Sequence, residues 1–409
     1  MGRFRWLRVV RWYLNHFHSF TKLNHTNKAL TLLGGITPSQ FLADYWQKKP
    51  LLIKQAIPNF TGLLAPNELA GLACEDDVQA RIISFKKDKW SVKHSPFDET
   101  DFTKLPKTNW TLLVQNVNHY LPEAADLLAL FSFIPHARLD DLMVSYAPKG
   151  SGIGAHVDSY DVFLLQGAGK RNWKISAQKE LGMVENAPLK ILQNFKAEQE
   201  WVLEAGDMLY LPPHIAHWGV SESDNCMTYS IGFRAAKTQE LAQEFLNYLQ
   251  DNLAQDNIDA EGLYTDADLG LQKHPAEIST NMVTRVNGML QKLTWDKQHV
   301  ADFLGHYLTE PKLDVVFTPA RKISKAEFTK QLAAKTLLLS LKSQLLFTND
   351  RFYLNGEKLV VPAEIKEAIK YLADKKYLNI TALQANIHAA CSDALYEAYL
   401  AGYVCFKHE

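Results

Sequence analysis

The stretch that decides the fold reads Gly206-Asp207-Met208-Leu209-Tyr210-Leu211-Pro212-Pro213-His214-Ile215-Ala216-His217. It runs from a predicted strand, through a proline corner, to a histidine. Upstream of it, the tripeptide His156-Val157-Asp158 begins six residues after Gly150. Residues i and i+2 of a β-strand project from the same face, so His156 and Asp158 can meet one ion together. With His217 contributed from a second strand, the two stretches predict a metal site of two imidazoles and one carboxylate.

This ligand set is the facial triad of non-haem Fe(II) oxygenases, which leaves coordination positions open for substrate and dioxygen. Both spacings resemble the two cupin motifs, which place metal ligands inside a small β-barrel. The chain has 14 histidines, and a lone histidine is more often structural than a ligand. His214 competes with His217, but the cupin pattern usually has glycine at position 214 and the ligand at position 217. A cupin glutamate ligand has no counterpart here, so we expect His156, Asp158 and His217 as the catalytic metal ligands.

Alternation along a further predicted strand, Arg171-Asn172-Trp173-Lys174-Ile175, directs a charged side chain inward. Trp173 and Ile175 share a face, which should be the buried one, and Arg171 shares it. A buried guanidinium is costly unless an anion meets it, and its fork matches a carboxylate. We therefore expect Arg171 to hold the C5 carboxylate of 2-oxoglutarate. Lys170 should lie in the turn and face solvent.

Two serines are further candidates for the 2-oxoglutarate site. Ser145 lies on the strand-like run Leu142–Tyr146, and Ser230 lies on the run Thr228–Ile231. Either hydroxyl can contact the co-substrate. Ordinary strand polarity explains each serine at least as well.

The composition excludes some classes of protein but does not identify one. The chain has 409 residues, enough for two or three domains, and its net charge of −1 gives no overall electrostatic attraction to nucleic acid. Hydrophobic and charged contents of 47% and 22% are ordinary for a globular protein. The four cysteines form no C-x-x-C pair, which favours free thiols in a reducing compartment, and we expect the cytoplasm. No apolar run is long enough to span a bilayer.

The N-terminal stretch, residues 1–35, differs from the rest. Residues 1–43 contain no acidic residue, and four arginines alternate with aromatic and aliphatic residues: Arg3, Arg5, Arg8 and Arg11. The stretch fits a basic amphipathic anchor, a targeting segment, or a dispensable extension from an upstream start codon. It lacks the apolar core and cleavage site of a secretory signal. We favour the dispensable extension.

The spacing of apolar residues divides the remaining chain into three regions of different predicted secondary structure. Residues 36–235 begin with a helical and a strand-like segment, and from residue 140 they are dense in short strand-like runs, as in a barrel or jelly roll. Residues 236–318 carry apolar residues at helical spacing, in Gln239–Leu253 and Glu277–Leu308. Residues 319–409 combine helices with an Asn355-Gly356 hairpin signal, which fits a helical unit with a β-wing.

Four segments carry a family resemblance. They are Asp140–Ser145, Gly154–Phe163, Gly206–Pro213 and Tyr229–Arg234. They resemble the bacterial ribosomal oxygenases of the JmjC and cupin superfamily, and most closely those members that hydroxylate an arginine of large-subunit ribosomal protein sixteen. The similarity extends from about Phe41 to the C-terminus.

The resemblance implies an α+β architecture with a double-stranded β-helix, a helical dimerisation region and a C-terminal winged-helix domain. It implies Fe(II) at His156, Asp158 and His217, 2-oxoglutarate at Arg171, dioxygen as the oxidant, and hydroxylation of an arginine β-carbon in a ribosomal protein. The expected assembly is a homodimer. One departure is His214, where relatives usually have glycine; it bears on the entrance of the site.

Two other classes of function stay open at this point. A metal-binding cupin with non-oxidative chemistry would keep the triad but not turn over 2-oxoglutarate. A winged-helix regulator would use the barrel as a ligand sensor and bind a DNA sequence tightly. The C-terminal region mixes lysines with acidic residues near Lys366 and Glu367, more like a solvated face than a recognition helix, so we expect no sequence-specific nucleic acid and no membrane partner.

Overall fold

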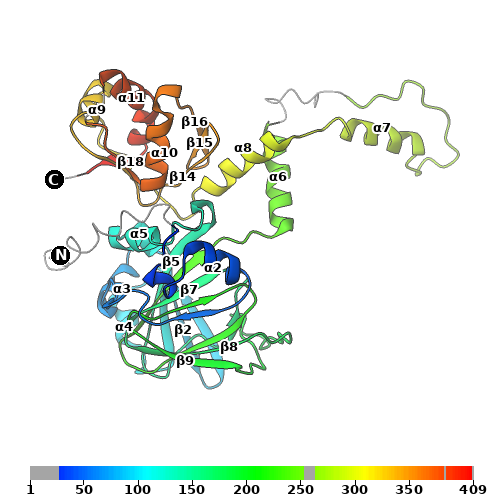
Figure 1. Cartoon of the computed structure of the whole chain (residues 1–409). Helices are drawn as coiled ribbons and strands as arrows, with labels where there is room; N and C mark the ends of the chain where they lie inside the picture. Colours follow the sequence, from blue (N-terminus) through cyan, green and yellow to red (C-terminus); the bar gives the residue numbers. More distant parts are fainter. Residues whose placement is uncertain (1–26, 253–262, 382–383, 408–409) are drawn as a thin grey trace. The chain divides into compact units, whose positions relative to one another are not determined.

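The structure is a computed structural model, and it describes residues 27–252, 263–381 and 384–407 (Figure 1). The described chain forms two compact units. The first, the barrel unit, extends to Ala235 and includes Leu313–Phe317; the second, the C-terminal unit, comprises Ala236–Lys312 and the chain from Thr318 onward. Most of the predicted basic extension falls on residues 1–26, which lie outside the described residues.

The barrel unit is built mainly from antiparallel strands. Its strands are β1 (Leu51–Ile53), β2 (Ala80–Lys86), β3 (Lys89–His94), β4 (Trp110–Val114), β5 (Leu139–Ala147), β6 (His156–Val157), β7 (Val162–Ala168), β8 (Lys170–Ser176), β9 (Gln199–Glu204), β10 (Met208–Leu211), β11 (Ala216–Ser221) and β12 (Cys226–Phe233). Its helices are η2 (Thr31–Leu33), α2 (Pro38–Asp44), α3 (Pro66–Leu72), α4 (Glu99–Thr103), η3 (Val117–His119), α5 (Pro122–Ala129) and η4 (His136–Arg138).

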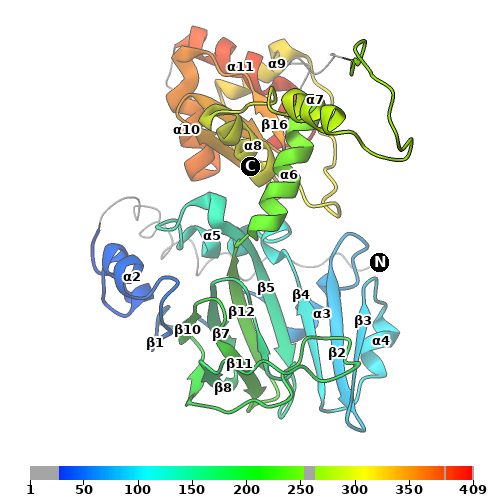
Figure 2. The same ribbon diagram turned by 90° about the vertical axis from the view of Figure 1, so that its right-hand side faces the viewer.

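These strands form two sheets. The larger has eight strands in the order β1-β10-β7-β12-β5-β4-β2-β3, and the smaller has four in the order β6-β11-β8-β9. Figure 2 shows the larger sheet running from β12 through β5 and β4 to β2 and β3. Consecutive strands such as β7 and β8 belong to different sheets, as in a double-stranded β-helix. The predicted jelly roll is confirmed.

An aromatic cluster anchors the N-terminal helix to the larger sheet. Thr37 caps α2 in a reciprocal capping box with Gln40, and Pro38 occupies the first turn. From this helix Phe41, which is fully buried, packs edge-on against Tyr210 of β10 with ring centroids 5.0 Å apart. The Tyr210 hydroxyl donates to Asp161 at 2.6 Å. These contacts hold β10 in place, and the chain then continues into His217.

The C-terminal unit begins with three helices and ends with a helix-and-wing fold. Its elements are α6 (Thr238–Asn252), α7 (Thr280–Leu290), α8 (Lys297–Thr309), α9 (Lys325–Leu332), β13 (Leu337–Leu339), β14 (Leu345–Thr348), β15 (Arg351–Leu354), β16 (Glu357–Leu359), η5 (Ala363–Ile365), α10 (Lys366–Lys375), β17 (Tyr377–Leu378), α11 (Ala385–Leu400) and β18 (Val404–Phe406). The Asn355-Gly356 hairpin joins β15 to β16, and both residues have positive φ, as such a turn requires. The expected winged helix is confirmed.

Two general expectations concern membranes and disulfides. Among the described residues, no helix is long and apolar enough to cross a bilayer. The four cysteines are all free thiols: Cys74, Cys226, Cys391 and Cys405.

Candidate metal centre

Two short strands of the smaller sheet bring the predicted ligands together. His156 lies on β6, Asp158 directly follows it, and His217 lies on β11. The strands pair antiparallel with His217 opposite His156. Both imidazoles therefore project from the same face of the sheet, and the single spacer Val157 returns Asp158 to that face.

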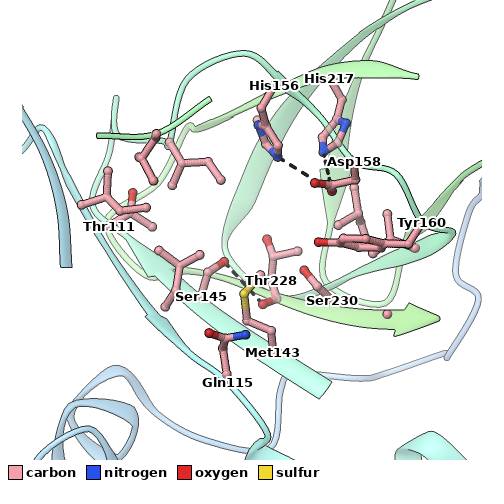
Figure 3. Close-up of a pocket in the computed structure, with 18 of the residues that line it drawn as sticks. Thr111, Gln115, Met143, Ser145, His156, Asp158, Tyr160, His217, Thr228 and Ser230 are labelled. Carbon is pink, nitrogen blue, oxygen red and sulfur yellow. Dashed lines mark hydrogen bonds and ion pairs between the residues drawn. The ribbon is translucent and has the colours of Figure 1, made fainter. Parts of the chain in front are cut away.

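The ligand atoms of His156, Asp158 and His217 all lie within 4.8 Å of one another (Figure 3). The Asp158 carboxylate is 3.6 Å from His217 Nε2 and 4.0 Å from His156 Nε2. The two imidazole centroids are 4.1 Å apart. Within the described part of the chain, this is the one group of three such side chains close enough to share an ion.

Backbone carbonyls orient both imidazoles. His156 Nδ1 lies 3.0 Å from the Gly154 carbonyl, and His217 Nδ1 lies 3.0 Å from the Ile215 carbonyl. A carbonyl only accepts, so each Nδ1 donates its proton to the carbonyl, and each Nε2 is the nitrogen that faces Asp158. Ligating histidines are held in this way by a hydrogen bond on the opposite nitrogen.

The electrostatics of His217 also fit a metal ligand. Its burial and the adjacent His156 imidazole lower its pKa to about 4, against the opposing effect of the Asp158 carboxylate. The ring is therefore neutral near pH 7, as coordination through nitrogen requires. The donor set and its protonation state fit a divalent transition metal.

A cavity of about 350 Å³ opens beside the triad. Its lining includes His156, Asp158, His217 and, on β8, Arg171. The Arg171 side chain is 3% exposed, as the strand alternation predicted, and its Nη2 is buried with no hydrogen-bond partner. An unpartnered cationic group inside a cavity fits an anionic ligand, because burial of such a group is otherwise unfavourable. The residues present therefore fit a dicarboxylate as well as a metal.

Close packing keeps the wall behind Arg171 rigid. Trp173, two residues along β8, lies with its ring 5.6 Å from the Arg171 guanidinium carbon. A side chain at Gly219 of β11 would place its Cβ only 2.7 Å from the Trp173 ring. Glycine at this position leaves the space that the indole occupies.

The other predicted residues are placed as follows. Ser145 on β5 and Ser230 on β12 both line the cavity, and the Ser145 hydroxyl donates to the Thr228 carbonyl at 3.5 Å. Lys170 is exposed and its Nζ is 2.6 Å from Glu204. His214 is exposed and is not among the cavity-lining residues. Its backbone N–H donates to the Asp158 carbonyl at 2.8 Å, so it contacts the ligand segment through its backbone.

Sequence reasoning missed several residues of the cavity. Thr111 on β4 is fully buried, and its hydroxyl has no partner. Tyr160 lies beside Asp158 with its hydroxyl toward the cavity (Figure 3), and desolvation and the Asp158 carboxylate raise its pKa. A polar residue in the otherwise apolar run Trp110–Val114 was the available signal for Thr111. Tyr160 follows the second ligand by two residues and carried no pattern of its own.

Comparison with known families matches two parts of the chain. Residues 126–241 match a JmjC domain model, and residues 292–404 match a ROXA-like winged-helix model. Both matched segments agree with the observed barrel and winged helix.

Among characterised sequences, the chain is 34% identical over 369 residues to the ribosomal protein uL16 3-hydroxylase of Escherichia coli K12. That alignment covers 89% of this chain and 95% of the relative. A probable ribosomal oxygenase of Haemophilus influenzae is 38% identical over 278 residues, covering 66% and 65% of the two chains.

Solved structures give the same relationship. An X-ray structure of the Escherichia coli protein YcfD matches with a TM-score of 0.79 at 32% identity, covering 90% of this chain and 98% of that one. A structure of YcfD in complex with cobalt and 2-oxoglutarate matches with a TM-score of 0.76 at the same identity and coverage.

Proposed function

The chain belongs to the family of JmjC ribosomal oxygenases, and on that premise we propose that it hydroxylates an arginine side chain of a large-subunit ribosomal protein. As a member of this family it is a 2-oxoglutarate-dependent oxygenase. The single observation that supports the proposal most strongly is that one cavity holds both a two-histidine, one-carboxylate cluster and a buried arginine whose Nη2 has no hydrogen-bond partner.

We assign His156, Asp158 and His217 as the metal ligands. We assign the metal ion itself as Fe(II). A donor set of two imidazoles and one carboxylate suits a divalent ion with open positions. When bound, Fe(II) supplies the activation of dioxygen, coupled to decarboxylation of 2-oxoglutarate, that hydroxylation of a C–H bond requires. The carbonyls of Gly154 and Ile215 keep both Nε2 atoms directed at the ion.

We assign the far carboxylate of 2-oxoglutarate to Arg171. Its guanidinium presents N–H donors in a planar fork, and no acidic side chain forms an ion pair with it in the described chain. Ser145 and Ser230 line the same cavity and can add hydroxyl contacts, with Ser145 able to release its long bond to Thr228. The burial of Arg171 strengthens this charge-assisted contact.

The carboxylates of the cavity support arginine as the target residue. Asp140 and Asp141 line it together with Tyr160. Asp140 lies 3.5 Å from Arg234, and Asp141 accepts the backbone N–H of Asn116 at 3.1 Å, which fixes both acids in place. A substrate guanidinium entering the cavity would meet these two carboxylates, which match its planar fork, in a lining that also holds Arg81, Arg171 and Lys190.

We propose a homodimer in the cytoplasm as the working form. We propose three domain boundaries: residues 36–235 form the catalytic barrel, residues 236–318 the dimerisation region and residues 319–409 the winged-helix domain. In the C-terminal unit, α6 and α8 pack together through Phe245 and Phe303, whose ring centroids are 5.3 Å apart. In contrast, α7 leaves an apolar stripe exposed, for which a second copy of the chain is the proposed cover: Met282, Val283, Val286 and Leu290.

Incubation of the purified protein with ribosomal protein uL16, Fe(II) and 2-oxoglutarate tests the activity. We expect uL16 to gain the mass of one oxygen atom, with one succinate released per hydroxylation, and peptide fragmentation to locate the oxygen on an arginine. Replacement of that arginine by lysine is the matched control and should abolish the gain. Hydroxylation of another residue type would overturn the arginine assignment, and the absence of any Fe(II)-dependent succinate would overturn the oxygenase.

A further inference from the structure

A buried sulfur atom contacts the proposed 2-oxoglutarate anchor. Arg171 Nε donates a hydrogen bond to Cys226 Sγ at 3.4 Å. Cys226 begins β12 and is fully buried. The Arg171 side chain makes no other hydrogen bond in the described chain, and one of its terminal nitrogens, Nη2, is buried without a partner. The sulfur therefore holds the inner edge of the guanidinium and leaves the outer N–H groups for a ligand.

A second polar side chain fixes the position of this sulfur. Gln166 on β7 donates from Nε2 to Cys226 Sγ at 3.4 Å and to the Ala168 carbonyl at 2.7 Å. Its Oε1 accepts the Thr228 hydroxyl at 3.1 Å. Gln166 and Thr228 are both almost completely buried, so these bonds are shielded from water. The sulfur thus accepts two N–H groups, one from β7, which pairs with β12, and one from β8 of the smaller sheet.

We propose that Cys226, fixed by Gln166, is a positioning residue that aligns Arg171 for the carboxylate of 2-oxoglutarate. The inference rests on the proposed role of Arg171. A thiol sulfur is a weak, uncharged acceptor, so it orients the guanidinium without neutralising it. An aspartate or glutamate at position 226 would instead form a bidentate ion pair with Arg171 and compete with the ligand. Cysteine keeps both the orientation and the free positive charge.

The first experiment measures 2-oxoglutarate binding and turnover in Cys226→Ala and Cys226→Ser. Cys226→Ala should weaken the binding of 2-oxoglutarate, measured by titration calorimetry on the anaerobic Fe(II)-loaded protein, by roughly fivefold, since the one weak hydrogen bond that orients the guanidinium is lost. The KM for 2-oxoglutarate should rise by a similar factor, while kcat at saturating co-substrate changes less than about twofold. Cys226→Ser keeps an acceptor and should restore most of the affinity.

The matched control is Cys391→Ala, which removes a fully buried thiol from the C-terminal unit. It should leave the Kd and KM for 2-oxoglutarate unchanged. If Cys226→Ala unfolds, as thermal melting would show, Cys226→Val removes the acceptor while retaining side-chain volume. Unchanged affinity in a folded acceptor-free variant would overturn the positioning role, as would a loss that Cys226→Ser does not restore.

Arg171→Ala separates failure of this inference from failure of the proposed function. If Arg171→Ala itself leaves the Kd for 2-oxoglutarate unchanged, the anchor is elsewhere and the proposed role of Arg171 is wrong. If Arg171→Ala weakens binding, adding Cys226→Ala to it should weaken binding no further, because the sulfur acts through the guanidinium. An additional fivefold loss in the double variant would overturn the positioning role while leaving Arg171 as the anchor.

Discussion

At the scale of single residues, the site depends on which side chains share a face. The spacer in His156-Val157-Asp158 and the pairing of β6 with β11 place three ligand atoms within 4.8 Å of one another. The competing histidine, His214, is three residues from His217, yet it lies in the turn before β11 and is exposed. Its φ of 69° is in the left-handed region, which glycine adopts at lower cost than histidine.

Asp158→Ala removes the one anionic ligand and should abolish Fe(II)-dependent succinate formation. We expect turnover to fall by more than about a hundredfold, since loss of a group that merely supports a ligand can already cost that much. The barrel should still fold, because the Asp158 side chain is at the cavity and not in the core. Succinate release and circular dichroism measure the two effects. Turnover near that of the unmodified protein would refute the triad.

His214→Gly should retain iron and make the protein more stable. The left-handed backbone at this position costs about 1 kcal/mol for a residue with a Cβ, and glycine relieves that cost. The N–H that donates to Asp158 is unchanged. Metal analysis and thermal melting check both results, with His214→Ala as a control that should give no gain. Loss of iron in His214→Gly would mean that the second histidine ligand is His214.

The individual site residues were predictable to different degrees from the sequence. Arg171 could be found because alternation with Trp173 and Ile175 fixes its direction. Cys226 and Gln166 could not, since each approaches the site from a different strand, and strand order does not follow from local pattern. The contact between Cys226 and Arg171, 55 residues apart, is a property of the closed barrel.

At the scale of elements, strong local signals gave correct predictions. The Asn355-Gly356 turn joins β15 to β16 as predicted, and the helical spacing in Gln239–Leu253 matches α6 closely. Shorter elements were missed. The strand β14 pairs with β15 but has only four residues and no alternation, because Leu345, Leu346 and Phe347 are consecutive apolar residues. Its place is determined by the partner strand.

The end of α10 offers a test of local strain. Lys376 terminates this helix with φ 64°, and its half-buried side chain carries a buried, unpartnered Nζ. Lys376→Gly should raise the melting temperature of the C-terminal unit by relieving about 1 kcal/mol of backbone strain and removing a buried charge. Lys375→Gly, one residue earlier within α10, is the control. It should lower the melting temperature, because glycine destabilises a helical position. An unchanged or lower melting temperature in Lys376→Gly would contradict the account.

The buried amine of Lys376 should also make the stability of the C-terminal unit depend on pH. Burial lowers the pKa of Lys376 to about 8, below its unfolded value of about 10.4. The folded state therefore releases this proton first, and the penalty of the buried charge is full below pH 8 and declines as the pH rises toward 10.4. The melting-temperature difference between Lys376→Gly and the unmodified protein should narrow over this interval. A constant difference would show that the amine is solvated in the folded state.

At the scale of the whole molecule, length and periodicity indicated several domains, and the barrel and winged helix are present. Among the described residues, α7 carries an exposed apolar stripe, with Val283 56% and Leu290 60% exposed. The residues of this stripe lie on one face of the helix. An apolar helical face of this kind is expected to pack against another protein surface. The identity of the cover does not follow from one chain's pattern, so assembly is a prediction.

Sedimentation equilibrium at micromolar concentration should return twice the mass of one chain. Val286→Glu, which places a charge in the α7 stripe, should shift the protein toward a monomer, because an unpaired charge is costly in an apolar interface. Val360→Glu, at a position 82% exposed outside the three N-terminal helices of this unit, is the matched control and should remain dimeric. A monomer with full activity would remove the dimerisation role from α7.

The central claim is that this centre transfers an oxygen atom from dioxygen to a side chain of a ribosomal protein. The most direct test supplies isotopically heavy dioxygen in ordinary water to the protein with Fe(II), 2-oxoglutarate and uL16, followed by mass spectrometry of uL16 and succinate. We expect one heavy oxygen atom in uL16 and one in each succinate. An ordinary oxygen atom in uL16 under heavy dioxygen, or succinate formed without any modified uL16, would contradict it.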